Sequence, residues 1–231
     1  MLSRERHLRL GSIALGLMFL MLLPFVHYSL GFGWRGFTRD LTGVTYIYTS
    51  GARLPNAGIF GHMMLGALVT LLAPLQLMSS LRDRWPTLHR AGGYLLVTAA
   101  MLTAGGGLAY IAVRSTIGGA LMDAGFSLYG ACLIVAAAMT VHHARRRERQ
   151  HHRRWALRLF FLVIASWLYW AHYGVWHAVT GGLASEKDFS GLFDQIQNFA
   201  FFVPYLIALE IYFRLRRPPA ASIQSLQERA S

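Results

Sequence analysis

The chain has 231 residues, of which 55% are hydrophobic and only 14% are charged. This composition is too apolar for a soluble domain of this length, and the single cysteine, Cys132, excludes an intramolecular disulfide. The formal net charge of +12 resembles that of a nucleic-acid-binding protein, but the basic residues lie between long apolar segments, so we expect no nucleic-acid partner.

Apolar runs of about 20 residues, each long enough to cross the roughly 30 Å hydrocarbon core of a bilayer as a helix, follow one another along the chain. We expect spans at about 11–30, 57–80, 91–113, 119–143, 155–180 and 196–213. The sequence therefore predicts an all-α polytopic membrane protein, a six-transmembrane-helix bundle. It forms one domain over residues 1–217, followed by a disordered cytoplasmic tail over 218–231.

The arginines set the expected orientation. Of the 22 basic residues, 17 lie before the first span, between the second and third, around the turn between the fourth and fifth, or after the sixth. These segments all fall on one side of a six-span protein, and positive residues stay in the cytoplasm. We therefore expect both termini to be cytoplasmic in a multi-pass protein of the bacterial cytoplasmic (inner) membrane. The lipid bilayer is its first partner, and anionic head groups suit the inner arginines.

The first connection and two of the spans contain further features that predict local structure. Residues 31–56 form the longest one, and the alternation from Val44 to Thr49 indicates an extended lid over the outer mouth. Pro74 predicts a kink in the second span. In the third span, the glycines at 105–107 let a backbone or a flat cofactor approach closely.

Histidine doublets flank the basic turn between the fourth and fifth spans. We interpret His142-His143 and His151-His152 as solvated loop residues, except His152, which lies directly before the inner end of the fifth span. Glu210 has two interpretations, either an i,i+4 pair with Arg214 or an interior partner for Arg158 or a histidine.

Ionisable side chains inside hydrocarbon cost roughly 2.5–3.5 kcal/mol on insertion scales, so they are functional candidates. His62 and Gln76 are 14 positions apart, as are Arg158 and His172, and this spacing places each pair on one helix stripe that we expect to face the bundle interior. Depth then divides the candidates into two clusters. The outer cluster, a candidate haem or metal site, contains His62, His172 and Asp123, and the inner polar cluster contains Gln76, Arg82, His89, Arg90, His152, Arg153, Arg158 and Glu210.

The order of these residues is similar to that of a bacterial membrane family, the domain of unknown function 2306. The resemblance covers roughly residues 58–215, and the family often has a basic residue near position 170, where this chain has Trp170 and His172. It implies a multi-helix membrane protein with important His, Gln, Arg and Glu positions, and it implies no reaction. The segments that carry it are Gly61-His62, Gly66, Ala73-Pro74-Leu75-Gln76, Leu81-Arg82, Pro86, Leu88-His89-Arg90, Gly93-Tyr94, Gly125-Phe126, His152-Arg153-Arg154-Trp155, Arg158 and Ala208-Leu209-Glu210.

Three functions remain open, and whether the protein is an enzyme is undecided. The first is membrane redox, with b-type haem, quinone or both. Here His62 would pair with His172 in the outer leaflet, and His89 with His152 in the inner leaflet, with arginines binding the propionates. This two-level arrangement is similar to that of the six-helix, two-haem cytochrome b family that ascorbate reduces.

The second function is a transporter or membrane enzyme for an amphiphilic anionic substrate of lipid or prenyl type. Arginines of the inner cluster would clamp the anion, and a histidine would act as acid–base. The third is a non-catalytic assembly factor or sensor. A metal site formed by His62, His172 and Asp123 is a further alternative.

Overall fold

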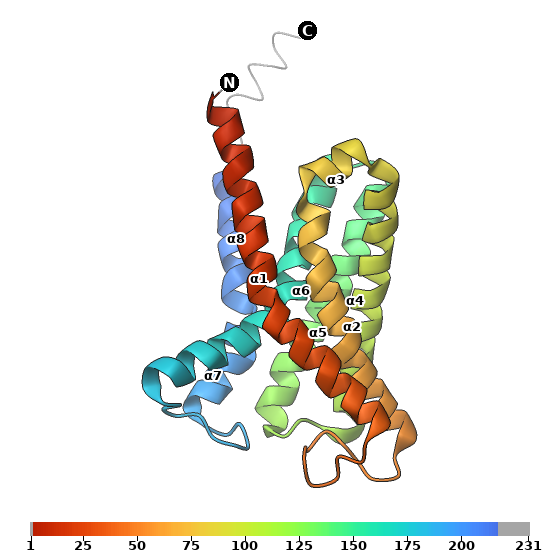
Figure 1. Ribbon diagram of the computed structural model, residues 1–231, viewed down its shortest axis with the longest axis vertical. Helices are drawn as coiled ribbons and strands as arrows, with labels where there is room; N and C mark the ends of the chain where they lie inside the picture. Colours follow the sequence, from red (N-terminus) through yellow and green to blue (C-terminus); the bar gives the residue numbers. More distant parts are fainter. Residues whose placement is uncertain (1, 217–231) are drawn as a thin grey trace.

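The computed structural model describes residues 2–216, so the expected tail at 218–231 lies outside the described residues. The described chain is helical, without strands, and its helices run alternately up and down (Figure 1). They are α1 (Leu2–Thr38), α2 (Arg53–Leu77), α3 (Ser79–Arg84), α4 (Pro86–Arg114), α5 (Gly119–Arg145), α6 (Arg149–Thr180), α7 (Leu192–Ala200) and α8 (Val203–Leu215).

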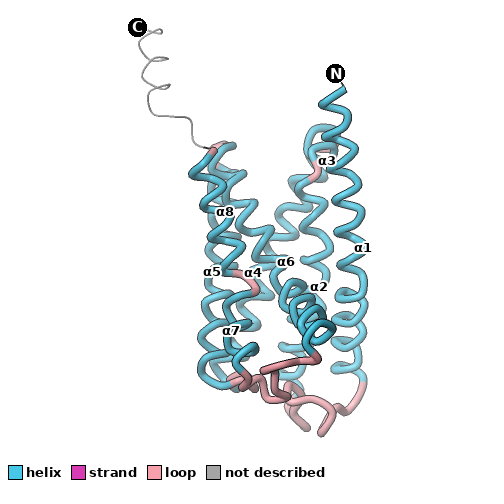
Figure 2. The backbone as a smooth tube through the Cα atoms, turned by 90° about the vertical axis from the view of Figure 1, so that its left-hand side faces the viewer, coloured by secondary structure: helices cyan, strands magenta, loops and turns pink. Residues whose placement is uncertain are grey.

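Six segments of the described chain are long and apolar enough to cross a membrane, which confirms the predicted all-α polytopic fold. Their mean hydropathy lies between 1.3 and 2.0. Helices α1, α2, α4, α5 and α6 each supply one span, and α7 and α8 together supply the sixth, Leu192–Leu215. Figure 2 shows that most of the loops gather at one end of the bundle. The end at which α1 begins and α8 ends is called the arginine-rich end below.

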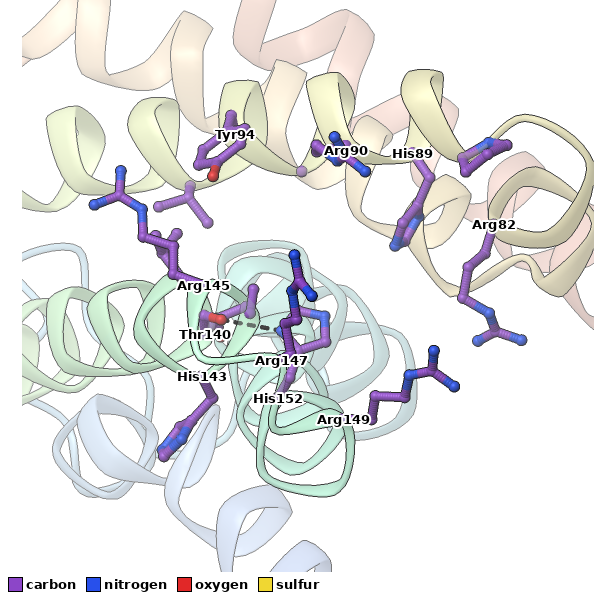
Figure 3. Close-up of a pocket in the computed structure, with 15 residues that line it drawn as sticks. Arg82, His89, Arg90, Tyr94, Thr140, His143, Arg145, Arg147, Arg149 and His152 are labelled. Atoms are coloured by element: carbon purple, nitrogen blue, oxygen red, sulfur yellow. Dashed lines mark hydrogen bonds between the residues drawn. The ribbon is translucent and has the colours of Figure 1, made fainter.

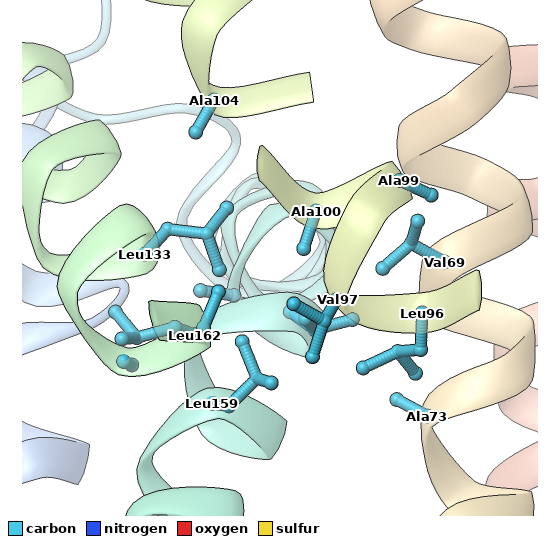
Figure 4. Close-up of a cluster of buried hydrophobic side chains, with 14 of the residues drawn as sticks. Val69, Ala73, Leu96, Val97, Ala99, Ala100, Ala104, Leu133, Leu159 and Leu162 are labelled. Atoms are coloured by element: carbon cyan, nitrogen blue, oxygen red, sulfur yellow. The ribbon is translucent and has the colours of Figure 1, made fainter. Parts of the chain in front are cut away.

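Four of the helices form the centre of the bundle. Helix α4 packs against α2 and α5, and α6 packs against the same two helices, so α4 and α6 occupy opposite corners of this group. Small and branched side chains fill the space between them, among them Val97, Ala100, Leu133 and Leu162 (Figure 4). The alanines let the helices approach closely, as small residues do in membrane bundles. Helix α1 packs mainly along α2.

The first connection is shorter than expected. Helix α1 continues through Pro24 to Thr38, and α2 begins at Arg53, so the loop comprises residues 39–52. It consists of turns and not of the extended lid that the alternation had predicted. Asn56 fastens it, because its side chain accepts a hydrogen bond from the Thr49 amide at 3.0 Å and donates one to the Thr49 carbonyl at 2.7 Å.

At the arginine-rich end, two helices begin earlier than their apolar runs. Helix α4 starts at Pro86, where a proline suits the first helical turn because no amide partner is needed there. Helix α6 starts at Arg149, although its apolar run starts near residue 155. Polar residues can extend a membrane helix into water, since arginine heads remain hydrated. His89 and His152 therefore lie in the first turns of helices.

The last span is broken in two, which hydropathy did not indicate. Phe201 and Phe202 separate α7 from α8, and both are buried against the aromatic rings of Tyr129 and its neighbours. Pro204, in the first turn of α8, has no amide hydrogen with which a helix could continue from α7 into α8. The expected single helix at 196–213 is therefore two helices.

Candidate functional site

A cavity of about 440 Å³ opens at the arginine-rich end, between the first turn of α4 and the corner where α5 meets α6 (Figure 3). Five arginines and three histidines line it, and no carboxylate of the described part of the chain does. Its apolar lining includes Tyr94, Val97 and Val141. A cavity with this charge attracts an anion, and its apolar part suits an amphiphilic one. The basic lining residues are Arg82, Arg90, Arg145, Arg147, Arg149, His89, His143 and His152.

Two of the histidines come from α4 and α6, which lie diagonally opposite each other in the four-helix group. His89 lies on α4 and points toward the α5–α6 corner (Figure 3), and its buried Nδ1 has no hydrogen-bond partner among residues 2–216. His152 lies on α6, where its Nδ1 is 3.0 Å from the Thr140 carbonyl oxygen. A carbonyl can only accept a hydrogen bond, so Nδ1 is the donor, and in a neutral imidazole with this tautomer the lone pair is on Nε2.

The other predicted residues of the inner cluster are divided between this cavity and its surroundings. Arg82 and Arg90 line the cavity, and Arg82 also pairs with the neighbouring Asp83 at 3.0 Å. Gln76 lies against Gly92 and Gly93 of α4, where a methyl group on Gly92 would collide with its amide. Arg153 is exposed and does not line the cavity.

Arg158 and Glu210 form an ion pair away from the cavity. The Arg158 Nε donates to Glu210 Oε1 at 2.6 Å, joining α6 to α8. The guanidinium also lies 4.4 Å from the ring centre of Trp155 and 5.1 Å from that of Phe213. Of the two interpretations of Glu210, the structure therefore shows the pair with Arg158.

The predicted outer cluster does not assemble as one site. His62 packs against Gly107 of α4 and contacts the Thr103 carbonyl through Nδ1 at 2.6 Å. His172 has partners at both ring nitrogens, the Gln197 amide near Nδ1 and the Tyr205 hydroxyl 2.8 Å from Nε2. Asp123 accepts a hydrogen bond from the Thr116 amide at 2.6 Å in the α4–α5 connection. Each of the three is thus held by a different part of the bundle.

A family model described as "Predicted membrane protein (DUF2306)" matches residues 59–208. The chain belongs to this family. The match contains His62, Gln76, His89, His152 and Arg158, and it ends before Glu210. Comparisons with curated proteins and with solved structures found no match.

Sequence reasoning missed a second polar group at the arginine-rich end of this DUF2306 bundle. His143 is not a solvated loop residue but lies in the last turn of α5, buried to 9% exposure. Its Nδ1 is 2.5 Å from a carboxylate oxygen of Glu148, and His151 is close by. The signal was present in the sequence, because the two histidine doublets stand on either side of one short turn that contains a single glutamate.

Sequence reasoning also missed a polar network at the end of the bundle opposite the arginine-rich end. Asp194 precedes the expected sixth span at 196–213, but in the structure it lies in α7 and is fully buried. It accepts hydrogen bonds from the Tyr173 hydroxyl at 2.7 Å, the Ser185 hydroxyl at 2.8 Å and the amides of Glu186 and Gly191. The polar positions Asp194, Gln197 and Asn198 share one buried face of α7, a helical spacing that could have indicated it.

Proposed function

We propose that this protein is a membrane redox protein that binds one b-type haem at the arginine-rich end, with His89 and His152 as axial ligands. The observation that carries the proposal is that these histidines, from opposite corners of the four-helix group, line one arginine-rich cavity. The alternative outer pair, His62 and His172, is less suited to bind haem, because both ring nitrogens of His172 have protein partners.

The residues of the cavity fit the chemistry of haem. An axial imidazole binds through one nitrogen, while a hydrogen bond at the other fixes its orientation. His152 has this arrangement through the Thr140 carbonyl, and His89 has a buried Nδ1 without a partner in the described chain. Arg90 and Arg145 would pair with propionates, and the apolar lining would exclude water. When bound, haem would supply one-electron transfer, for which a quinone is a membrane-soluble partner.

The positive-inside rule extends the proposal to location. We infer that the arginine-rich end faces the cytoplasm, with both ends of the chain on that side, and that the protein resides in the bacterial cytoplasmic membrane. The haem would then lie in the leaflet next to the cytoplasm.

Absorption spectroscopy tests the haem proposal. The purified protein, expressed with a haem supply, should show a Soret band that shifts on reduction with dithionite. His89→Ala and His152→Ala should each abolish the low-spin spectrum, whereas His172→Gln and His142→Ala, as matched controls, should leave it unchanged. A colourless wild-type protein, or a band unaffected by the first two substitutions, would overturn the proposal.

The apolar part of the cavity favours a second candidate. Tyr94, Val97 and Val141 would contact an acyl or prenyl chain while the arginines bind its phosphate or carboxylate, and His89 or His152 would transfer a proton. A transporter or enzyme of this kind would be colourless and would retain an anionic lipid in native mass spectrometry, lost in Arg90→Ala. A protein that retains neither haem nor lipid would favour the third function, an assembly factor or sensor.

A further inference from the structure

The corner between α5 and α6 brings three potential metal ligands together. They are His143, Glu148 and His151, whose donor atoms all lie within 4.8 Å of one another. The cluster involves neither of the proposed haem ligands. Only His143 is shared with the lining of the cavity.

Backbone geometry holds this cluster in place. The Glu148 amide donates to the His143 carbonyl at 3.0 Å and closes the turn, in which Arg147 adopts a positive φ of 59°. Glu148 is the N-cap of α6, and His151 follows three residues later, so both side chains project from the same face of the helix start. The cluster therefore depends on a short, closed segment and not on two mobile loops.

The ligand types also suit a transition metal. Two imidazoles and one carboxylate form a ligand set that zinc and other first-row transition metals use in proteins, with at least one coordination position left for water or an anion. Calcium and magnesium prefer sets made of oxygen alone.

We propose that His143, Glu148 and His151 bind one divalent transition-metal ion, zinc or a close relative, at the α5–α6 corner. The side chains are graded from buried to exposed, with His143 buried, Glu148 half-buried and His151 exposed, so an ion can enter from solvent. The neighbouring arginines, among them Arg146 and Arg149, are exposed, and salt screens exposed charges over about 10 Å. Their repulsion weakens the site without removing it.

Because His143 also lines the cavity, a metal ion here would stand beside whatever anion occupies it. The open coordination position would then be available to that anion. The metal proposal does not depend on this contact, and it holds for the protein with or without haem.

Cobalt and zinc binding test the site directly. The full-length protein should be purified in detergent with a tag that contains no histidine, stripped with EDTA and titrated with Co²⁺. We expect visible d–d absorption bands, displaced by Zn²⁺, and about one equivalent of metal per chain by elemental analysis.

Substitutions then locate the site. His151→Ala and Glu148→Gln should weaken binding by more than about tenfold, and neither replaces a buried side chain. His142→Ala is the matched control, since it removes an exposed imidazole adjacent to His143 and should leave the titration unchanged. Circular dichroism confirms folding of each variant. If the wild-type protein binds no Co²⁺ or Zn²⁺, or if His151→Ala and Glu148→Gln bind as tightly as wild type, the proposal is wrong.

Discussion

Arg158 and Glu210 are 52 positions apart in sequence, yet the guanidinium of one donates to the carboxylate of the other at 2.6 Å. The pair joins the middle of the bundle to the last helix, and the rings of Trp155 and Phe213 cover the guanidinium. Within residues 2–216 the other side-chain hydrogen bond between α6 and α8 joins His172 to Tyr205, and the buried side chains of α8, Leu209 and Phe213, are apolar. The ion pair therefore has a structural task separate from the cavity.

Glu210→Gln should lower the stability of the bundle by roughly 1–2 kcal/mol, because it leaves a half-buried guanidinium without its charged partner. Thermal unfolding in nanodiscs measures the loss. Arg214→Gln, which removes the alternative i,i+4 partner, should have little effect. Equal losses in the two variants would contradict the importance of the pair between α6 and α8.

Gly125→Ala should be destabilising by roughly 1–3 kcal/mol, because a methyl group there would meet the backbone carbonyl oxygen of Asn198 at 2.5 Å, and the backbone cannot move aside easily. Gly105→Ala is the control, since nothing lies within 4 Å of the added methyl group and alanine favours a helix by up to about 1 kcal/mol. Chemical unfolding of the two variants should therefore give shifts of opposite sign.

Asp194→Asn tests the network at the opposite end. Asp194 accepts hydrogen bonds from two hydroxyls and two amides, and an asparagine would place an amide donor against one of these donors. We expect a loss of about 2–4 kcal/mol, concentrated in the segment from Gly182 to Gly191. Limited proteolysis should cut this segment faster than in wild type, while Asp188→Asn, an exposed control, should be cut at the wild-type rate.

Thiol labelling tests the orientation. In a Cys132→Ala background, Ser50→Cys and Arg146→Cys place thiols at exposed positions of opposite ends. An impermeant reagent applied to spheroplasts should label Ser50→Cys alone, and inverted vesicles should give the reverse result. Labelling of Arg146→Cys in intact spheroplasts would show that the arginine-rich end faces outward.

Much of the candidate site was predictable, because the depth of a residue in the membrane follows from its position along the sequence relative to the apolar runs. The positions of His89, Arg90 and His152 near the arginine-rich end follow from where apolar runs begin, although the helices themselves start earlier than those runs. The stripe spacing was also informative, since His62 and Gln76 both lie against α4, and Arg158 and His172 both contact α8. Which of these stripes face one another could not be predicted, because rotation about a helix axis is set by packing with neighbours.

The sequence by itself determined the family, the six spans and the concentration of arginines at one end, since each depends on local hydropathy, charge and residue order. Only the tertiary structure decided that His172 binds Gln197 and Tyr205 instead of approaching His62, and that His143 turns toward Glu148. The break between α7 and α8 at Phe201 and Phe202 was also decided by the tertiary structure, because buried aromatic contacts stabilise it. These outcomes depend on side-chain packing between segments far apart in the chain, which hydropathy does not contain.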